Sequence, residues 1–362
     1  MKVLCIGHTS WDISCPVDNY PTENTKYRMT EKVSCGGGPA SNAAYLLGKW
    51  GVDTSIATVV GDDTFGDKIK KEFRSVNIKD DFIETAFDKD TSLSFILINK
   101  TNGSRTIFNV ATETIPLKKY VYDFTPDIIF TDGHDYGATQ NALNCYPKAI
   151  KIIDAGRVTP ELLELCKYMN YIVCSKVFAE TVSGIKIDYN NSTTLVNLYN
   201  ALRNKFPNST IVVTLEDMGA LYMINNEIKI MPGLKFKAVD TTGAGDIFHG
   251  AFTYCISNNY DLETSVTISN ITAGLSITKM GGRLSIPALS DVLDYYQGHM
   301  QGIRNVNNQI QMQNMAGANN QNQMQNLVGV NNQSQMQNMA GVNNQNQMQN
   351  MAGVNNQNGN NK

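Results

Sequence analysis

The chain has 362 residues, of which 17% are charged, and its formal net charge is −3 at pH 7. This small charge excludes a general electrostatic attraction to nucleic acid or to an anionic membrane, so any phosphate site must be local. No apolar run approaches the ~18 residues of a membrane span, and the first apolar run is too short for a signal peptide. The seven cysteines are scattered and form no C-x-x-C pair, which is typical of reduced thiols. We therefore expect a cytoplasmic protein without nucleic-acid or membrane partners.

Composition divides the chain near residue 298. Residues 1–298 have the composition of a globular domain, whereas residues 299–362 contain almost no charge and are rich in Asn, Gln, Met and Gly. The second part repeats every twelve residues, in units that start at Asn307, Asn319, Asn331, Asn343 and Asn355. One small apolar cluster per unit does not offset the entropy of ordering, so we expect a disordered tail. A β-solenoid is the weaker alternative, given the Gly and Asn content.

The first predicted element is a buried strand over residues 2–7, a short apolar run that ends at glycine. Asp12 follows this strand. Because ligands collect at the carboxyl ends of the strands in doubly wound sheets, Asp12 is a candidate for binding the hydroxyls of a polyol. A turn-forming aspartate explains the same residue equally well on this basis alone.

A glycine-rich segment, G-G-G-P-A-S-N, occupies residues 36–42. Before it, residues 27–35 alternate with period two, as in a half-exposed strand, and after it a helix is predicted over residues 43–50. The segment lacks the Lys and the hydroxyl of a Walker loop, so a phosphate cradle of that type is not favoured. A plain strand-to-helix turn remains open as an interpretation.

A hairpin is predicted next. Residues 92–98 and 105–110 alternate as two strands, and the polar loop N-K-T-N-G-S joins them. From Asp127 onwards, short apolar strands alternate with helical runs, which predicts a doubly wound, mainly parallel sheet covered on both faces. The predicted strands span residues 127–131, 149–154, 171–174 and 210–214, and the predicted helices span 138–145, 160–168, 178–184 and 194–205.

The segment V-D-T-T-G-A-G-D, residues 239–246, is the most informative of the chain. We expect it to continue a β-rich segment over 235–239 and to open, with its last residues, an amphipathic helix that contains Ile247 and Phe248. Gly243 and Gly245 let the backbone turn tightly, and the amides of the first helical turn then point at one spot, where an anion binds. Asp246 at this spot is suited to take a proton from a hydroxyl. An aspartate that only caps the helix is the alternative.

Residues 240–246 resemble the D-T-x-G-A-G-D signature of the ribokinase (PfkB) family of sugar and nucleoside kinases, and Gly37, Gly38 and Asn42 fit its other signature, G-G-x-x-x-N. The resemblance covers residues 1 to about 297. It implies a ribokinase-like α/β fold with a small β-sheet lid from about 27–35 and 91–110, so that residues 1–298 form the kinase domain. It also implies ATP-dependent phosphorylation of a sugar hydroxyl.

The same resemblance implies a role for individual residues. The base would be Asp246, and the amides that stabilise the transferred phosphoryl group would belong to Gly243, Ala244 and Gly245. The implied acceptor-binding residues are Asp12, Gly37, Gly38, Asn42 and Arg105. The implied nucleotide-binding residues are Thr214, Gly219, Thr242, Gly243 and Gly245.

Two metal sites are implied as well. Mg²⁺ would bridge the phosphates of ATP. A monovalent cation would lie near Asp240 and Thr242, and the sequence leaves the K⁺ dependence open. Ribokinases often carry N-x-x-E after a strand for magnesium handling, whereas this chain has Ser175 and Phe178 there, which leaves Glu180 as a candidate substitute.

The acceptor is less defined than the family. The strings A-S-N, N-G-S-R-T-I and S-K-x-x-A resemble those of ketohexokinases, so fructose or a related ketohexose is the first prediction. A ribokinase or an adenosine-type nucleoside kinase of the same family is the alternative. A non-catalytic member that binds sugar or assembles with partners is the alternative from another class. Homodimers through the lid are common in the family, and the sequence does not decide the oligomeric state.

Overall fold

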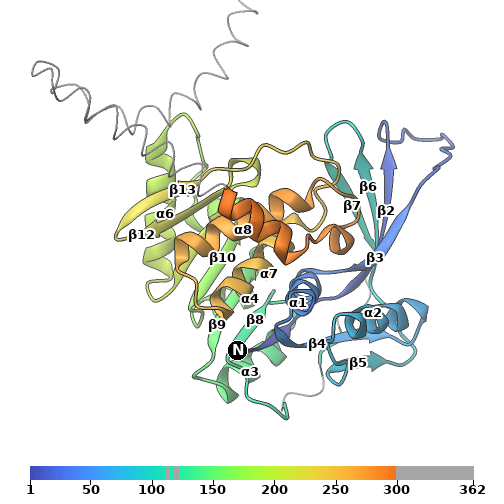
Figure 1. The fold of residues 1–362 in the computed structure, drawn as a ribbon, viewed down its shortest axis with the longest axis horizontal. Helices are drawn as coiled ribbons and strands as arrows, with labels where there is room; N and C mark the ends of the chain where they lie inside the picture. The colour runs from blue at the N-terminus through green and yellow to red at the C-terminus, as the bar shows by residue number, and fades with distance from the viewer. Residues whose placement is uncertain (111–114, 118–121, 299–362) are drawn as a thin grey trace, which may run out of the picture. The chain divides into compact units, whose positions relative to one another are not determined.

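The computed structural model describes residues 1–110, 115–117 and 122–298. Met1–Ile187 and Thr193–Gly298 form one unit, which contains a large sheet, a small sheet and the helices around them (Figure 1). Asp188–Ser192 belong to a second unit, in which Asp188 closes a turn by accepting a 2.9 Å hydrogen bond from the amide of Asn190. The predictions for the repeats at 299–362 lie outside the described residues.

The large sheet has the strand order β13-β12-β11-β10-β9-β8-β1-β4-β5. All neighbours are parallel from β11 to β5, and the hairpin β12–β13 adds two antiparallel strands at one edge. The predicted doubly wound, mainly parallel sheet is therefore confirmed. The strands are β1 (Lys2–Ile6), β4 (Asp53–Gly61), β5 (Ile83–Ala86), β8 (Ile128–Thr131), β9 (Ile150–Ala155), β10 (Tyr171–Ser175), β11 (Thr210–Thr214), β12 (Ala220–Ile224) and β13 (Glu227–Met231).

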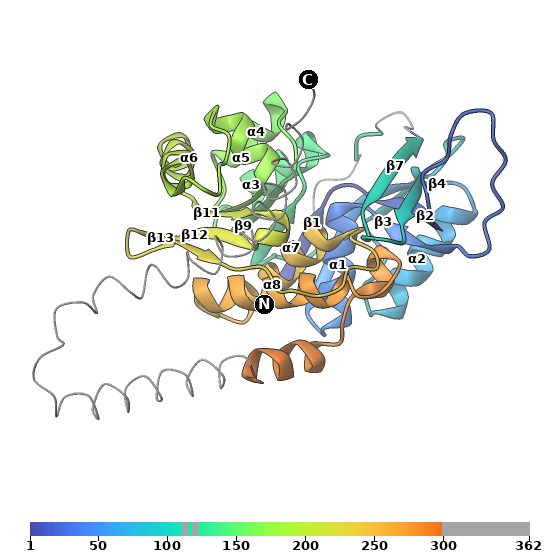
Figure 2. The ribbon, with the colours of Figure 1, turned by 90° about the horizontal axis from the view of Figure 1, so that it is seen from above.

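Helices cover both faces of this sheet (Figure 2). One face carries α1 (Pro39–Lys49), α2 (Thr64–Ser75), α7 (Ala244–Ser257) and α8 (Leu262–Ser276). The other carries α3 (Tyr136–Cys145), α4 (Pro160–Cys166), α5 (Lys176–Ser183) and α6 (Ser192–Lys205). Residues 289–298 are also helical. Within the part of the chain that the structure describes, no helix is both long and apolar enough to cross a membrane.

The helix starts differ in a way that bears on function. In α2, α3, α4, α5 and α8, a side chain at the N-cap accepts hydrogen bonds from the first amides. In α1 and α7 the N-cap residue is a glycine, Gly38 or Gly243, which has no side chain to cap the helix. The first amides of these two helices are therefore left for other partners.

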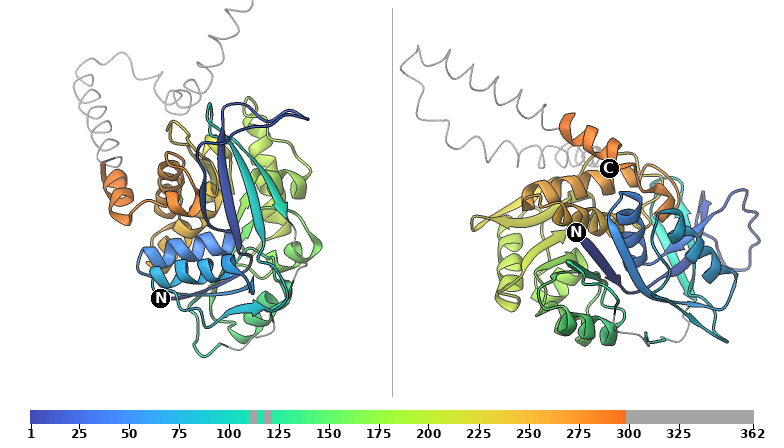
Figure 3. Two further views of the ribbon diagram at one scale, coloured as in Figure 1. Left: turned by 90° about the vertical axis from the view of Figure 1, so that its right-hand side faces the viewer. Right: turned by 60° about the horizontal axis from the view of Figure 1, so that its bottom comes forward.

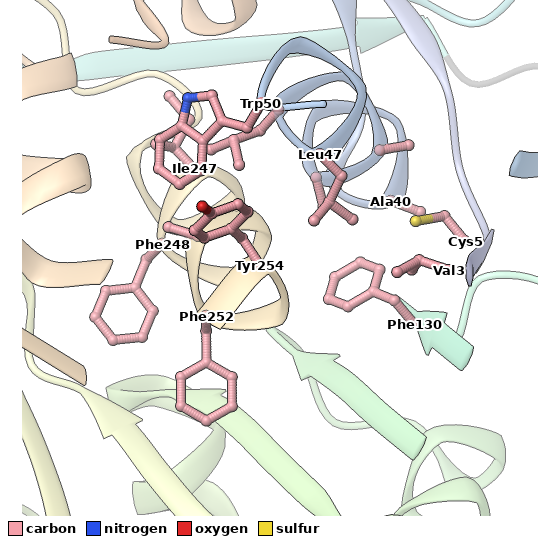
Figure 4. Packing of buried hydrophobic residues seen from close by; sticks show 14 of the residues in the cluster. Val3, Cys5, Ala40, Leu47, Trp50, Phe130, Ile247, Phe248, Phe252 and Tyr254 are labelled. Atoms are coloured by element: carbon pink, nitrogen blue, oxygen red, sulfur yellow. The ribbon is translucent and has the colours of Figure 1, made fainter. Parts of the chain in front are cut away.

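Helix α7 is the centre of the hydrophobic core. Its side chains are buried all round from Ile247 to Ser257, between α1, α8 and the sheet (Figure 4). Tyr254 meets the ring of Trp50 on α1 edge-on, with 4.9 Å between the ring centroids. Phe252 is fully buried, and truncating such a side chain to alanine costs about 3–5 kcal/mol. Packing of this kind fixes the position of the α7 N-terminus.

The small sheet, called the lid from here on, has the order β3-β2-β6-β7, and its strands run side by side (Figure 3). They are β2 (Ser10–Val17), β3 (Val33–Gly37), β6 (Leu93–Asn99) and β7 (Arg105–Val110). The hairpin prediction is confirmed, but the predicted strand at 27–35 is wrong for residues 27–32, which form no strand.

The central lid strand β2 was missed because Pro16 interrupts its pattern. At Pro16 the strand pairs only with β6, since the pairing with β3 stops at Ser14. A proline is tolerated where one neighbour needs no amide donor. Asp12 therefore lies within a lid strand and not in a loop after β1.

The predicted β-rich segment at 235–239 is also wrong. These residues alternate between exposed and half-buried side chains, yet they form no ladder with another strand. A Cβ on Gly274 of α8 would lie 3.1 Å from the ring of Phe236, so this segment packs against α8. The side chains of residues 235–239 alternate because every second one faces α8. Pairing with another strand is not needed to produce this pattern.

Candidate active site

The turn before α7 leaves the amides of Gly245 and Asp246, the second and third residues of the helix, uncovered. Gly243 has φ 72°, a conformation that favours glycine, and the amide of Ala244 donates to the carbonyl of Thr241 at 3.3 Å, which closes the turn. A Cβ on Gly245 would meet no described atom within 4 Å, so the space in front of this residue is open. Free amides at a helix N-terminus, with the helix dipole behind them, form an anion site.

Asp246 lies in the first turn of α7, half-buried beside these amides. Its Oδ2 accepts a 2.7 Å hydrogen bond from Nδ2 of Asn42. Burial and the nearby Asp154 carboxyl raise the pKa of Asp246 to about 7, although the hydrogen bond from Asn42 lowers it. A carboxylate with a pKa near neutrality is well matched to accepting a proton from a hydroxyl.

Asp12 and Gly37 lie against each other on neighbouring lid strands. Ser10 Oγ donates to Asp12 Oδ1 at 2.8 Å. A Cβ on Gly37 would lie 2.0 Å from Asp12 Oδ2, so only glycine leaves room for this carboxylate. Burial raises the pKa of Asp12, and hydrogen bonds from Ser10 and Ser94 oppose the shift.

Asp132 fixes the start of α1 relative to the end of β1. Its Oδ2 accepts hydrogen bonds from the amides of His8 at 2.8 Å and Ala40 at 3.1 Å. Gly38, between them, has φ 96°, and a Cβ there would lie 2.5 Å from the carbonyl oxygen of His8. Asn42 follows on the same helix, which places its side chain at Asp246. The helix starts at Pro39, earlier than the expected Ala43, because proline suits the first helical position.

A polar cluster lies at the carboxyl ends of β1, β8 and β9. The ring centroids of His8 and His134 are 4.4 Å apart, and Nη2 of Arg157 lies 3.3 Å from Nδ1 of His134. Burial lowers the pKa of His8 to about 4, so this ring is neutral at physiological pH. His134 thus has polar partners at the end of the sheet where acceptor groups are expected.

Arg105 reaches from the lid to the turn before α7. Its Nη1 donates to Oγ1 of Thr241 at 2.9 Å. The amide of Thr241 in turn donates to the carbonyl of Gly103, at the tip of the same lid hairpin, at 3.1 Å. The predicted acceptor-binding side chain of Arg105 therefore contacts a residue of the turn that precedes α7.

Thr214 and Gly219 flank a tight turn at the end of β11. Gly219 has φ 95°, and a Cβ there would lie 1.9 Å from the carbonyl oxygen of Met231, so glycine is required by close packing against β13. Glu216, within the turn, has φ 58°, and its side chain is 70% exposed, with Lys176 Nζ at 3.9 Å. The carboxylate therefore points to solvent, as expected from its charge.

Glu180 does not fit the role of a substitute magnesium ligand. Its Oε2 lies 2.7 Å from Nζ of Lys186, and its Oε1 accepts a 3.0 Å hydrogen bond from the amide of Ile187. The ammonium group of Lys186 thus already neutralises the charge of this buried carboxylate, which a cation would otherwise need. Glu180 stabilises this local structure.

The residues of the expected monovalent-cation site do lie together. Asp240 is buried, and its two carboxylate oxygens accept hydrogen bonds of 2.8 Å from the amides of Thr242 and Gly281. The buried hydroxyl of Thr242 has no hydrogen-bond partner among the described residues. A buried negative charge beside an unpaired hydroxyl oxygen is a suitable set of donors for a cation.

Sequence reasoning missed His249, one turn after Gly245. Its Nδ1 lies 2.5 Å from the carbonyl oxygen of Gly245 and 3.3 Å from Oδ2 of Asp154, and its Nε2 lies 3.1 Å from the carbonyl oxygen of Val173. The ring therefore ties the first turn of α7 to β9 and β10. The only signal in the sequence is one polar residue in an otherwise apolar stretch of helix.

The amides of Gly245 and Asp246 can hold a phosphoryl group while the Asp246 carboxylate accepts a proton. These are the two tasks of a phosphotransferase that acts on an alcohol. Residues 1–121 and 138–289 match the model of the pfkB family carbohydrate kinases. The chain therefore belongs to this family, whose ribokinase members are ATP-dependent sugar kinases.

Two relatives and one solved structure show which members of the family are similar to this chain. The ribokinase of Staphylococcus aureus (strain COL) is 27% identical over 304 residues, which cover 80% of this chain and 98% of the relative. The nucleoside kinase of Methanocaldococcus jannaschii is 23% identical over 306 residues, 82% of this chain and 97% of the relative. The fold is similar to that of Arabidopsis thaliana ribokinase complexed with ribose and ATP, with a TM-score of 0.67, 18% identity and coverage of 81% and 97%. The predicted family is confirmed, whereas these relatives do not support the ketohexokinase subtype.

Proposed function

We propose that this kinase transfers the γ-phosphoryl group of ATP to a hydroxyl of a small sugar, with Asp246 as the base. The observation that carries the proposal is the position of the Asp246 carboxylate beside the uncovered amides of α7. A helix cap alone would not explain it, because no described side chain occupies the cap position and the carboxylate is bound by Asn42 instead.

Residues of this chain then supply each role in the reaction. Asp246 takes the proton of the acceptor hydroxyl, and the oxygen forms a bond to the γ-phosphorus while the bond between that phosphorus and the bridging oxygen of ADP breaks. The amides of Gly245 and Asp246 face the charge on the transferred group. Asp12 and the backbone at Gly37 hold the other hydroxyls of the sugar. The products are the sugar phosphate and ADP, and Asp246 returns its proton to solvent.

A pentose such as ribose is our first choice of acceptor. Support comes from the ribokinases among the relatives. A nucleoside is the second choice, because the relatives include a nucleoside kinase. A base would need aromatic side chains on both sides, but Trp11 and Phe65 stack on each other at 5.8 Å, and Trp11 lies on the opposite face of β2 from Asp12. A ketohexose remains a prediction from the sequence strings.

Mg²⁺ and K⁺ complete the proposal. No group of three or more His, Cys, Asp or Glu side chains in residues 1–110, 115–117 and 122–298 could hold a metal ion, so we propose that Mg²⁺ arrives on the phosphates of ATP. When bound, it neutralises the phosphate charge. Asp240 and Thr242 would hold a monovalent cation, K⁺ first, next to the anion turn. Replacing KCl by tetramethylammonium chloride should then lower kcat.

We further propose that the lid pairs with a second copy of the chain. Every residue of the edge strand β7 is exposed. Phe108 lies opposite Phe95 in the register, and both side chains are exposed on one face together with Val110. An exposed, apolar edge strand is a template for pairing. Sedimentation should show a dimer for the parent protein and a monomer for Phe108→Lys.

We also propose a cytoplasmic location, and the cysteines support it. All seven are unpaired, and Cys145 is the exposed one. Unpaired thiols of this kind are typical of a reducing environment, which supports the prediction of a cytoplasmic protein.

A panel of acceptors tests the proposed function. ADP release from MgATP would be measured with ribose, deoxyribose, fructose and adenosine, at equal protein concentrations. We expect the highest kcat/KM with a pentose. Transfer to none of these acceptors, with ATP binding intact, would favour a non-catalytic sugar-binding protein.

A further inference from the structure

Arg283 is a buried charge that the mechanism above does not use. It lies in the short helical turn Gly282–Ser285 after α8, and its side chain is fully buried. The guanidinium carbon lies 5.0 Å from the ring centroid of Tyr45 and 4.9 Å from that of Phe73. A buried charge is costly unless it is paired and hydrogen-bonded, so its partners define why it is there.

The guanidinium group has three partners. Nη1 donates to Glu72 Oε2 at 2.7 Å, and Nη2 donates to Ser41 Oγ. Nε donates to Oδ1 of Asn42 at 3.3 Å. The planar fork of an arginine can serve three acceptors in fixed directions, which a lysine ammonium on a flexible stem does not do.

These contacts decide the orientation of the Asn42 amide. Because a guanidinium only donates, the end of the amide that faces Arg283 must be the oxygen. The NH₂ end must then face the other way, where Nδ2 donates to Asp246 at 2.7 Å. A flipped amide would turn two donors toward Arg283 and an acceptor toward a carboxylate. The chain of contacts from Glu72 to Asp246 is therefore chemically consistent in one orientation only.

The orientation matters for the state of the base. Burial and Asp154 favour the protonated form of Asp246, and the donor from Asn42 favours the carboxylate, which lowers the pKa of the group. A hydrogen bond to the charged form of an acid is lost if the amide can rotate freely. The covalent structure of Asn42 does not fix the orientation of its side-chain amide, so contacts with neighbouring residues must do so.

The same ion pair reaches the lid. Glu72 on α2 accepts hydrogen bonds from the amide of Gly36 at 3.0 and 3.3 Å. A Cβ on Gly36 would lie 2.2 Å from Nη1 of Arg283, so the guanidinium occupies the space that a side chain would fill. Gly36 is adjacent to Gly37, which contacts Asp12.

We propose that Arg283 is a positioning residue for phosphoryl transfer, which holds the Asn42 amide with its NH₂ group toward Asp246 and is itself held by Glu72. The proposal rests on the proposed role of Asp246 as base. It assigns to Arg283 an effect on the protonation of the base that goes beyond filling the core.

The test is the pH dependence of kcat for Arg283→Lys, with saturating MgATP and the best acceptor of the panel. Lysine retains the charge and can pair with Glu72, so the variant should stay folded, but it does not hold the Asn42 amide. We expect kcat to fall about fivefold at pH 7, because the acid limb of the profile should move up by about one pH unit, the equivalent of one hydrogen bond. Thermal melting should change little.

Two further variants distinguish a positioning role of Arg283 from a purely structural one. In the background Asn42→Ala, Arg283→Lys should produce no additional shift, because Arg283 acts only through that amide. Arg74→Met, which breaks the ion pair of Arg74 with Asp80 at the end of α2, is the matched control and should leave the profile unchanged.

The outcomes are distinct. A folded Arg283→Lys protein with the profile of the parent overturns the proposal, and so does an equal shift in the Asn42→Ala background. If Arg283→Lys does not fold, Gly36→Ala, which displaces the guanidinium while all its partners remain, must show the same direction of shift. A parent protein that transfers phosphate to no acceptor refutes the proposed function instead.

Discussion

The large sheet and the lid differ in how their residues are held. Strands β1, β8, β10 and β11 of the large sheet are buried almost throughout, and α7, which carries Asp246, is packed on all sides. In the lid, every residue of β7 is exposed. In the proposed mechanism, the base therefore lies on the buried part of the molecule, whereas the acceptor contacts come in part from a sheet with an exposed edge strand.

The difference predicts two kinds of effect. Residues on the α7 turn should control kcat, because their positions are set by core packing and they act on the transferred group. Lid residues such as Asp12 and Arg105 should control mainly the KM for the acceptor, because they bind groups that do not react.

The largest effect is expected for Asp246→Asn. Asparagine has the same shape and can still accept the hydrogen bond from Asn42, but it cannot take up the hydroxyl proton. We expect kcat to fall by at least about a hundredfold, with both KM values and the melting temperature nearly unchanged. Steady-state kinetics and thermal melting measure this. Near-parental turnover would reduce Asp246 to a structural residue.

Asp12→Asn should come second and act on the other parameter. The variant removes a charged acceptor for sugar hydroxyls, so the KM for the acceptor should rise about tenfold while the KM for ATP stays the same. Asp18→Asn is the matched control, because Asp18 directly follows the same lid strand and its side chain is 82% exposed. A rise in the KM for ATP with an unchanged acceptor KM would reverse the assignment of Asp12.

A smaller effect is expected for Arg105→Gln. The contact between Arg105 and Thr241 is lost, and with it the link between the lid hairpin and the anion turn. Because the side chain is exposed, we expect only about a three- to tenfold loss in kcat/KM for the acceptor. Lys100→Gln, at the same hairpin, removes the contacts of Lys100 with Asp18 and Glu31 and should have no such effect. Equal losses in both variants would argue for a general weakening of the hairpin.

The smallest effect is expected for a protein that ends at Gly298. The repeat units from Asn307 onwards carry no candidate catalytic group, so turnover should be unchanged. Asn- and Gln-rich repeats can associate through stacked side-chain amides, so light scattering should show larger assemblies only for the full chain. A loss of activity at unchanged melting temperature would mean that the tail takes part in the site.

The sequence predicts those parts of the molecule whose structure is determined by residues close together in the chain. Apolar runs separated by helical runs are sufficient to predict the parallel sheet. The glycine turn at 243–245 predicts an anion site next to Asp246. The central lid strand was missed because Pro16 hides it, and 235–239 was misread because side-chain alternation arises from packing on α8. In both cases a neighbour far away in the sequence decides the outcome.

The contacts that orient the site are of this long-range kind. Asn42 meets Asp246 across 204 positions and Arg283 across 241 positions of the chain. Nothing in the local pattern around Arg283 distinguishes it from a surface arginine in a turn. His249 is similar, because its partners on β9 and β10 become visible only in the folded chain.

The most direct test of the central claim is kcat of the parent protein between pH 5 and pH 9, at saturating MgATP and acceptor. Asp246 has a raised pKa of about 7, so it is the deprotonated base above that value and becomes protonated as the pH falls through it. If Asp246 is the base, kcat should reach a plateau above about pH 7 and fall about tenfold per pH unit below it. A kcat that stays constant down to pH 5 would contradict the role of Asp246 as the base.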